Sequence, residues 1–145
     1  MSDGRAAARV IAERAPGFTP RLGLILGSGL GGLADALEQP TAIDYADLPG
    51  FPQPGVAGHG GRLVLGTLAG LPVACLMGRR HIYEGGDPGG MKAPVRALRH
   101  AGAEALLATN AAGSLRADNP PGSLMAISDH INMLGVSPLT GPNDD

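Results

Sequence analysis

Four residues with chemically active side chains lie close together in the stretch GRRHIYEG, at positions 78–85. Arg79, His81 and Tyr83 alternate along the chain, so their side chains point the same way in an extended segment. The planar Arg79 guanidinium pairs with phosphate oxygens, His81 donates hydrogen bonds most strongly when protonated, and the Tyr83 phenol suits a sugar hydroxyl. Glu84 is placed to orient His81 or Arg79. The alternative interpretation is a surface turn held by salt bridges.

A glycine-rich stretch, LGLILGSGLGG at positions 22–32, is the second candidate. Its five leading apolar residues fit a buried strand, and Leu33–Leu37 fits a helix. A strand, a glycine turn and a helix in this order form an anion-binding motif, because backbone N–H groups at the start of the helix point toward the anion. Ser28 adds a hydroxyl in the turn. We therefore predict that a phosphate-sized anion binds at Ser28.

The same glycines leave two alternatives open. Gly27, Gly29 and Gly32 satisfy the pattern G-x-G-x-x-G, which suggests a dinucleotide-binding fingerprint. That fingerprint also requires an acidic residue at the end of a second strand about twenty residues further on. Asp44 and Asp47 come earlier and lie beside a proline-rich loop. The other alternative is a tight turn that binds no ligand.

Further candidates lie in loops. Asn110 follows an apolar segment and precedes small residues, where backbone N–H groups favour an anion nest, unless the turn merely needs small residues. His59, between glycines in a long loop, is either a mobile contact over a site or a histidine with no role. Asp129 and His130 form either a catalytic dyad or a structural pair, and we favour the structural pair.

The expected secondary structure places these residues along one edge of a sheet. We expect helices over 2–15, 33–37 (ended by Gln39-Pro40) and 91–101. The expected strands are 22–26, 42–45, 62–67, 71–77, 105–109 and 124–128, with a hairpin turn at Ala69-Gly70. Alternating strands and helices predict an α/β fold with a mixed, mostly parallel sheet flanked by helices. Ligands bind at the carboxyl ends of strands in such sheets, so the candidate residues are expected to face one site.

Composition excludes several classes of protein. The 145 residues suit one domain, and the net charge of −2 gives no reason to expect a nucleic acid or an acidic membrane as partner. Cys75 is the single cysteine, which excludes an intrachain disulfide and a cysteine-rich metal site, and we interpret it as a core thiol. No histidine and carboxylate spacing resembles a metal site. No signal peptide or membrane-spanning segment is recognisable, so we expect a cytoplasmic protein.

Taken together, the motifs resemble the trimeric purine nucleoside phosphorylases, in particular their bacterial inosine, guanosine and xanthosine branch. The resemblance covers most of residues 20–145. It rests, in order, on ILGSGLGGLAD (25–35), PGVAGHGGRLVLG (54–66), MGRRHIYEG (77–85), TNAAGSLR (109–116) and SDHINMLGVSPLTGPND (128–144). The resemblance implies a pentosyltransferase of purine salvage. Phosphate would attack C1′ of a purine ribonucleoside and release free purine and ribose 1-phosphate.

The resemblance also implies how phosphate is held. Ser28, Arg79 and His81 match the phosphate-binding serine, arginine and histidine of the family, and the Ala111 backbone matches a further phosphate contact. The transition state resembles an oxocarbenium ion, so a positioned phosphate dianion stabilises it electrostatically. Inorganic phosphate is a co-substrate, and no metal or organic cofactor is implied.

The remaining site residues are assigned by the same resemblance. Tyr83 matches the tyrosine that touches the ribose, and Asn110 matches the asparagine beside the ribose and the base. Glu84 and His59 match residues close to the phosphate. We group His59 with the substrate-binding residues, and we take His81 and Glu84 as the catalytic candidates.

The chain differs from this family in length, since family chains are about twice as long. We therefore expect residues 1–145 to form a single, truncated nucleoside phosphorylase domain, the amino-terminal half. Without the residues that select the base, the preferred purine and the activity of this chain alone stay open. Apolar surface is expected to be exposed where the other half would pack. The alternative is a catalytically silent chain that binds phosphate or associates with other subunits, and a homotrimer is expected only when the missing half is present.

Overall fold

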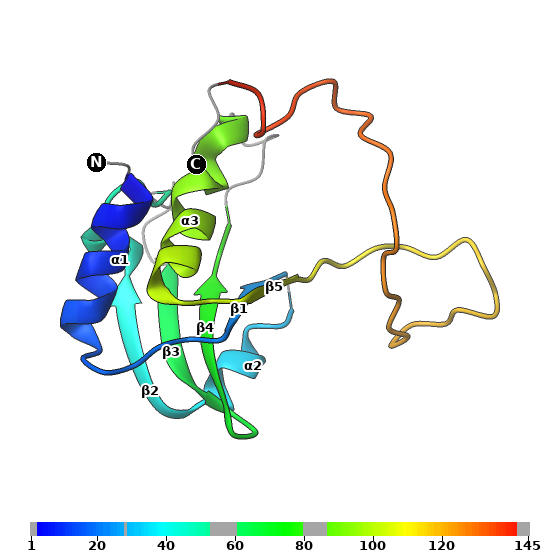
Figure 1. Cartoon of the computed structure of the whole chain (residues 1–145). Helices are drawn as coiled ribbons and strands as arrows, with labels where there is room; N and C mark the ends of the chain where they lie inside the picture. Colours follow the sequence, from blue (N-terminus) through cyan, green and yellow to red (C-terminus); the bar gives the residue numbers. More distant parts are fainter. Residues whose placement is uncertain (1–2, 28, 53–60, 80–86, 142–145) are drawn as a thin grey trace.

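A five-stranded sheet forms the centre of the computed structural model, which describes residues 3–27, 29–52, 61–79 and 87–141 (Figure 1). The strands lie in the order β2 (Glu38–Asp44), β3 (Arg62–Leu68), β4 (Leu71–Met77), β1 (Leu22–Leu26) and β5 (Ala105–Ala108). β1 pairs in parallel with both β4 and β5, whereas β2, β3 and β4 pair antiparallel. The described sheet is therefore mixed, as predicted, but its pairings are two parallel and two antiparallel rather than mostly parallel. β5 lies at its edge.

Helices lie on both faces of the sheet. α1 (Asp3–Arg14) and α3 (Lys92–Ala101) pack side by side on one face, close to the expected positions, and the short α2 (Gly32–Asp35) lies on the other (Figure 1). Side chains alternate between the faces of a strand, so the apolar strand residues build one core under α1 and α3 and a second against α2. None of the helices in the described residues has the length and apolar character needed to span a bilayer.

The β3–β4 hairpin confirms the predicted turn. Ala69 and Gly70 separate the two strands and have φ values of 49° and 80°. A type I′ turn requires positive φ at both central residues. Its twist matches the right-handed twist of the two strands that it joins. The β4 thiol of Cys75 is buried, as expected, and burial raises its pKa to about 11.

Two expectations about the segment after β1 are wrong. The helix expected over 33–37 is the single turn α2, and Gln39-Pro40 belongs to β2 instead of ending a helix. Proline is tolerated in β2 because this strand lies at the edge of the sheet. The β2–β3 register shifts between Glu38 and Thr41, and Gln39 has a φ of 50°. Sheet pairing therefore overrides the local helix signal.

The strand expected at 124–128 is also absent. Residues 110–141, which we call the arm, contain no helix or strand, leave the sheet after β5 and return toward the start of α3 (Figure 1). No residue of the arm is buried. An apolar run becomes a strand only when a neighbour pairs with its backbone, and within the described residues nothing pairs with this one.

Candidate functional site

Three strand ends meet at one edge of the sheet. β4, β1 and β5 are parallel neighbours, so their carboxyl ends lie side by side and are followed by Gly78-Arg79, Gly27 and Thr109-Asn110. A Cβ added to Gly27 would lie 2.8 Å from the Thr109 carbonyl oxygen. The chain segments after β1 and β5 are therefore in direct contact. Described residues of all three predicted stretches, Gly27, Arg79 and Asn110, come together here.

Thr109 joins the ends of β1 and β5 by hydrogen bonds. Its hydroxyl accepts from the Gly27 backbone N–H at 2.9 Å and donates to the Ile25 carbonyl at 3.1 Å. Its own N–H donates to the same Ile25 carbonyl at 2.9 Å. The sequence motifs did not single out this threonine, because its role depends on the β1–β5 neighbourhood rather than on local pattern.

Arg79 connects the end of β4 to the same junction. The half-buried Arg79 side chain donates from Nη1 to the Thr109 carbonyl at 2.6 Å. This bond extends the guanidinium from β4 across the end of β1 to β5. It places the charged guanidinium beside Thr109, which also bonds Gly27 at the start of the glycine turn.

Tyr45, in the short 3-10 helix η1 (Tyr45–Asp47), contacts the chain directly after β4. Its hydroxyl donates to the Gly78 carbonyl at 2.8 Å, directly before Arg79 in the chain. Its ring packs edge-on against Phe51, with ring centroids 5.0 Å apart. Burial, with a smaller effect of Cys75, raises the pKa of the Tyr45 phenol above its ordinary value. Sequence reasoning missed Tyr45, since its partner lies 33 positions away.

Replacing Tyr45 by phenylalanine is expected to lower the free energy of unfolding by about 1 kcal/mol, the net value of a typical hydrogen bond. The ring and its packing on Phe51 are retained, so the loss reports the bond to Gly78. Urea denaturation measures it. Ser123→Ala is the matched control, because the Ser123 hydroxyl donates to the Pro120 carbonyl at 2.7 Å but is exposed on the arm. A loss at Ser123 as large as that at Tyr45 would contradict this assignment.

Three backbone N–H groups of the segment after Gly29 already have partners within the chain. Leu30, Leu33 and Ala34 donate their backbone N–H groups to the preceding turn, at 3.2, 3.0 and 3.0 Å. α2 is one turn long, so its dipole is small. The Arg79 guanidinium adds a positively charged side chain at the same edge, beside Thr109.

The other predicted residues divide into two groups. The Asn110 amide donates to the Ala111 carbonyl at 3.2 Å, and both residues are exposed beside the Thr109 junction. The other predicted site residues lie outside the described residues; they are Ser28, His59, His81, Tyr83 and Glu84. The Asp129 carboxylate accepts from the backbone N–H of His130 at 2.8 Å. This bond does not involve the imidazole, so the structural interpretation of the pair stays a prediction.

Comparison with known proteins gives the family. The family model described as Phosphorylase superfamily matches residues 21–145. The chain belongs to the phosphorylase superfamily. It is 49% identical over 139 residues to purine nucleoside phosphorylase 1 of Bacillus subtilis, and 50% identical over 138 residues to purine nucleoside phosphorylase 1 of Geobacillus stearothermophilus. These relatives confirm the resemblance to purine nucleoside phosphorylases.

A solved phosphorylase structure shares the fold. Isoform 2 of purine nucleoside phosphorylase from Schistosoma mansoni, in complex with cytosine and ribose-1-phosphate, superposes with a TM-score of 0.87 at 38% identity. The match covers 97% of this chain and 50% of that chain. The two bacterial relatives are matched over 91% and 95% of this chain and over 51% and 50% of their own length. The chain thus spans about half the length of the curated relatives it matches.

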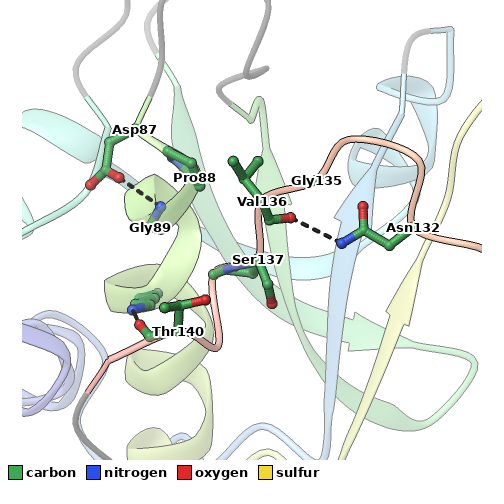
Figure 2. Close-up of a pocket in the computed structure, with 10 residues that line it drawn as sticks. Asp87, Pro88, Gly89, Asn132, Gly135, Val136, Ser137 and Thr140 are labelled. Carbon is green, nitrogen blue, oxygen red and sulfur yellow. Dashed lines mark hydrogen bonds between the residues drawn. The ribbon is translucent and has the colours of Figure 1, made fainter.

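A separate cavity of about 690 Å³ lies where the arm of this phosphorylase chain returns to α3 (Figure 2). It is lined by the start of η3 (Pro88–Met91), by Lys92 and by arm residues between 132 and 140. Its polar groups already bond within the chain: Asp87 accepts from the Gly89 N–H at 2.9 Å, and Asn132 donates to the Val136 carbonyl at 3.0 Å. Among the described residues, none of the predicted site residues lines this cavity, which lies between the arm and the start of α3.

Proposed function

We propose that this chain supplies the phosphate-holding half of a purine nucleoside phosphorylase. The reaction is the phosphorolysis of a purine ribonucleoside to free purine and ribose 1-phosphate. The observation that carries the proposal is the junction at Thr109, where Arg79 reaches across the end of β1 to the segment that bears Asn110 and Ala111. Three separate motifs of the sequence are thereby brought to one edge of the sheet.

The proposed mechanism uses the charge at this edge. Arg79, Ser28 and His81 hold the phosphate dianion, with the Ala111 backbone as a further contact, in line with C1′ of the ribose. As the bond to the purine breaks, positive charge develops on the ribose ring, and the bound dianion stabilises it. A planar arginine fork suits this task, because it fixes two phosphate oxygens at once.

The other assignments complete the proposal. Tyr83 contacts the ribose, Asn110 lies beside ribose and base, and His59 contributes to substrate binding close to the phosphate. His81 and Glu84 are the catalytic candidates near the phosphate. We also propose a cytoplasmic enzyme that forms a homotrimer once both halves of the fold are present. The complementary half would supply the residues that select the purine.

Thermal unfolding of the chain with and without phosphate tests the proposal. A ligand that binds only the folded state stabilises it by about 2.7 kcal/mol at one hundred times its Kd. We expect millimolar phosphate to raise the melting temperature, and we expect no effect from a nicotinamide dinucleotide. An inosine phosphorolysis assay run on the same sample reports whether this chain alone turns over. Stabilisation without turnover favours a formed half-site that is catalytically silent by itself.

Arg79→Met should abolish the phosphate effect, because the charge that holds the anion is removed. Arg21→Met is the matched control, since Arg21 forms an exposed ion pair with Glu104 at 3.1 Å, at the opposite ends of β1 and β5. Equal phosphate stabilisation of the two variants, or none in the unaltered chain, would contradict the proposed function.

A further inference from the structure

Tyr45 joins three separate segments of the chain. It belongs to η1, its backbone N–H donates to the Gly61 carbonyl at 2.9 Å, and its hydroxyl donates to the Gly78 carbonyl at 2.8 Å. A Cβ built on Gly61 would lie 3.0 Å or less from three carbons of the Tyr45 ring. The ring therefore lies directly against Gly61, and a side chain at position 61 would displace it.

Gly61 and Gly78 lie at the open end of the β3–β4 hairpin. Gly61 comes directly before β3 and Gly78 directly after β4, and the last pair between these strands is Arg62 with Met77. A Cβ built on Gly78 would lie 3.6 Å from the Gly61 Cα, so the two glycines are neighbours. Tyr45 donates to the carbonyl groups of both. It thereby continues the connection between the two strands beyond the end of their ladder.

The backbone at Gly78 is one that needs to be held by its surroundings. Its φ of 102° lies in the region that favours glycine, and a residue without a Cβ has little steric restriction on its own rotation. The peptide group after Gly78 consists of the Gly78 carbonyl and the N–H of Arg79. The bond from the Tyr45 hydroxyl therefore fixes the direction in which the Arg79 backbone leaves β4.

Arg79 is thus held at both ends. Tyr45 bonds the carbonyl that precedes it, and its guanidinium donates to the Thr109 carbonyl at 2.6 Å. A flexible side chain loses conformational freedom when it binds an anion, and a side chain already held in place loses less. The two contacts therefore pre-organise the guanidinium at the edge of the sheet where β4, β1 and β5 end.

Tyr45 is itself firmly anchored. Its side chain is 2% exposed and belongs to the core cluster under α1 and α3, where its ring packs on Phe51. Burial raises the pKa of its phenol, so the hydroxyl keeps its proton and stays a donor at neutral pH. The hydrogen bond to Gly78 therefore connects the rigid core to the segment that bears Arg79.

We propose that Tyr45 is a positioning residue, which sets the affinity of Arg79 for phosphate by holding the Gly78 carbonyl; this rests on the proposed function. Tyr45 acts through the backbone and not on the reacting atoms. Its removal should therefore weaken phosphate binding while the fold is retained.

Titration calorimetry with inorganic phosphate compares the unaltered chain with Tyr45→Phe. Phenylalanine keeps the ring against Gly61 and Phe51 but cannot donate to the Gly78 carbonyl. A conformation that is less populated raises the apparent Kd in proportion, and one hydrogen bond changes such a population by up to about fivefold, so we expect the Kd for phosphate to rise about threefold to fivefold. Circular dichroism at the temperature of the titration checks that both chains are folded.

Ile11→Val is the matched control for lost stability. Ile11 is 2% exposed and belongs to the same core cluster as Tyr45, but it lies on α1 and outside the predicted site. Removal of one buried methylene group should destabilise the chain to an extent comparable with Tyr45→Phe. The Kd for phosphate should stay within the error of the unaltered chain, because the Gly78 carbonyl keeps its bond.

The possible results separate this inference from the proposed function. A Kd that is the same in Tyr45→Phe as in the unaltered chain would overturn the positioning role and leave the proposed function intact. An equal rise of the Kd in Ile11→Val would also overturn it, since the effect would then follow stability alone. Failure of the unaltered chain to bind phosphate would contradict the proposed function and this inference together.

Discussion

Replacing Gly27 by alanine is expected to lower the free energy of unfolding by about 1–3 kcal/mol, the usual cost of inserting atoms into a packed interior. The added Cβ would lie 2.8 Å from the Thr109 carbonyl oxygen and 3.0 Å from Asn110 Cα. Both are backbone atoms, which cannot rotate out of the way as a side chain does. The ends of β1 and β5 must move apart. Because this displaces the predicted phosphate site, phosphate should stabilise the variant less than the unaltered chain. Urea denaturation and melts with phosphate measure the two effects.

Gly32→Ala is the matched control within the same glycine-rich motif. Gly32 is the first residue of α2, and no atom lies within 4 Å of a Cβ built there. Alanine has a higher helix propensity than glycine, so this change should leave stability unaltered or raise it by up to about 1 kcal/mol. Similar losses at Gly27 and Gly32 would show that close approach to β5 is not what makes Gly27 necessary.

The three glycines of the G-x-G-x-x-G pattern thus have different physical roles. Gly27 is needed because a backbone passes close to it, and Gly29 because its φ is 84°, a conformation that L side chains rarely adopt. Gly32 meets neither constraint. The G-x-G-x-x-G motif alone does not distinguish these roles, because the role of Gly27 depends on β5, more than 75 residues further along the chain. Only the turn itself was predictable from the local sequence.

Much of the sheet was predictable because its strands are apolar runs ended by turn residues. β1 was predicted with the observed bounds, β3 and β4 within one residue, and the turn at Ala69-Gly70 was placed correctly. These segments are buried, so they consist mainly of apolar residues and can be recognised as strands in the sequence. The edge strand β2 was predicted too short, since an edge strand tolerates proline and exposed residues, and these resemble a loop in the sequence.

Prediction from the sequence failed where structure depends on a distant partner. The run at 124–128 has strand composition but no neighbouring strand among the described residues. Tyr45 lies outside every motif, yet it bonds the residue before Arg79. For the site, spacing and resemblance led to Arg79, Asn110 and Ala111, which the sheet order brings to one edge. The assignments that fall outside the described residues stay predictions.

Replacing Thr109 by valine is expected to destabilise the chain by about 1–3 kcal/mol, although the two side chains have nearly the same shape. The change removes the bond from the Gly27 N–H to the Thr109 hydroxyl and the bond from that hydroxyl to the Ile25 carbonyl. Gly27 is buried, so its N–H would lose its partner where water cannot replace it. Urea denaturation gives the change in free energy of unfolding.

Thr109→Ser distinguishes the hydroxyl from the methyl group. Serine keeps both hydrogen bonds of the hydroxyl and should retain most of the stability. Valine keeps the methyl group of threonine but loses both hydrogen bonds. Because the Thr109 carbonyl also accepts from Arg79 at 2.6 Å, the valine variant should also bind phosphate more weakly than the serine variant. Equal stability of the two variants would mean that packing, rather than hydrogen bonding, joins β1 to β5. The position of Arg79 would then not depend on the hydrogen bonds of the Thr109 hydroxyl.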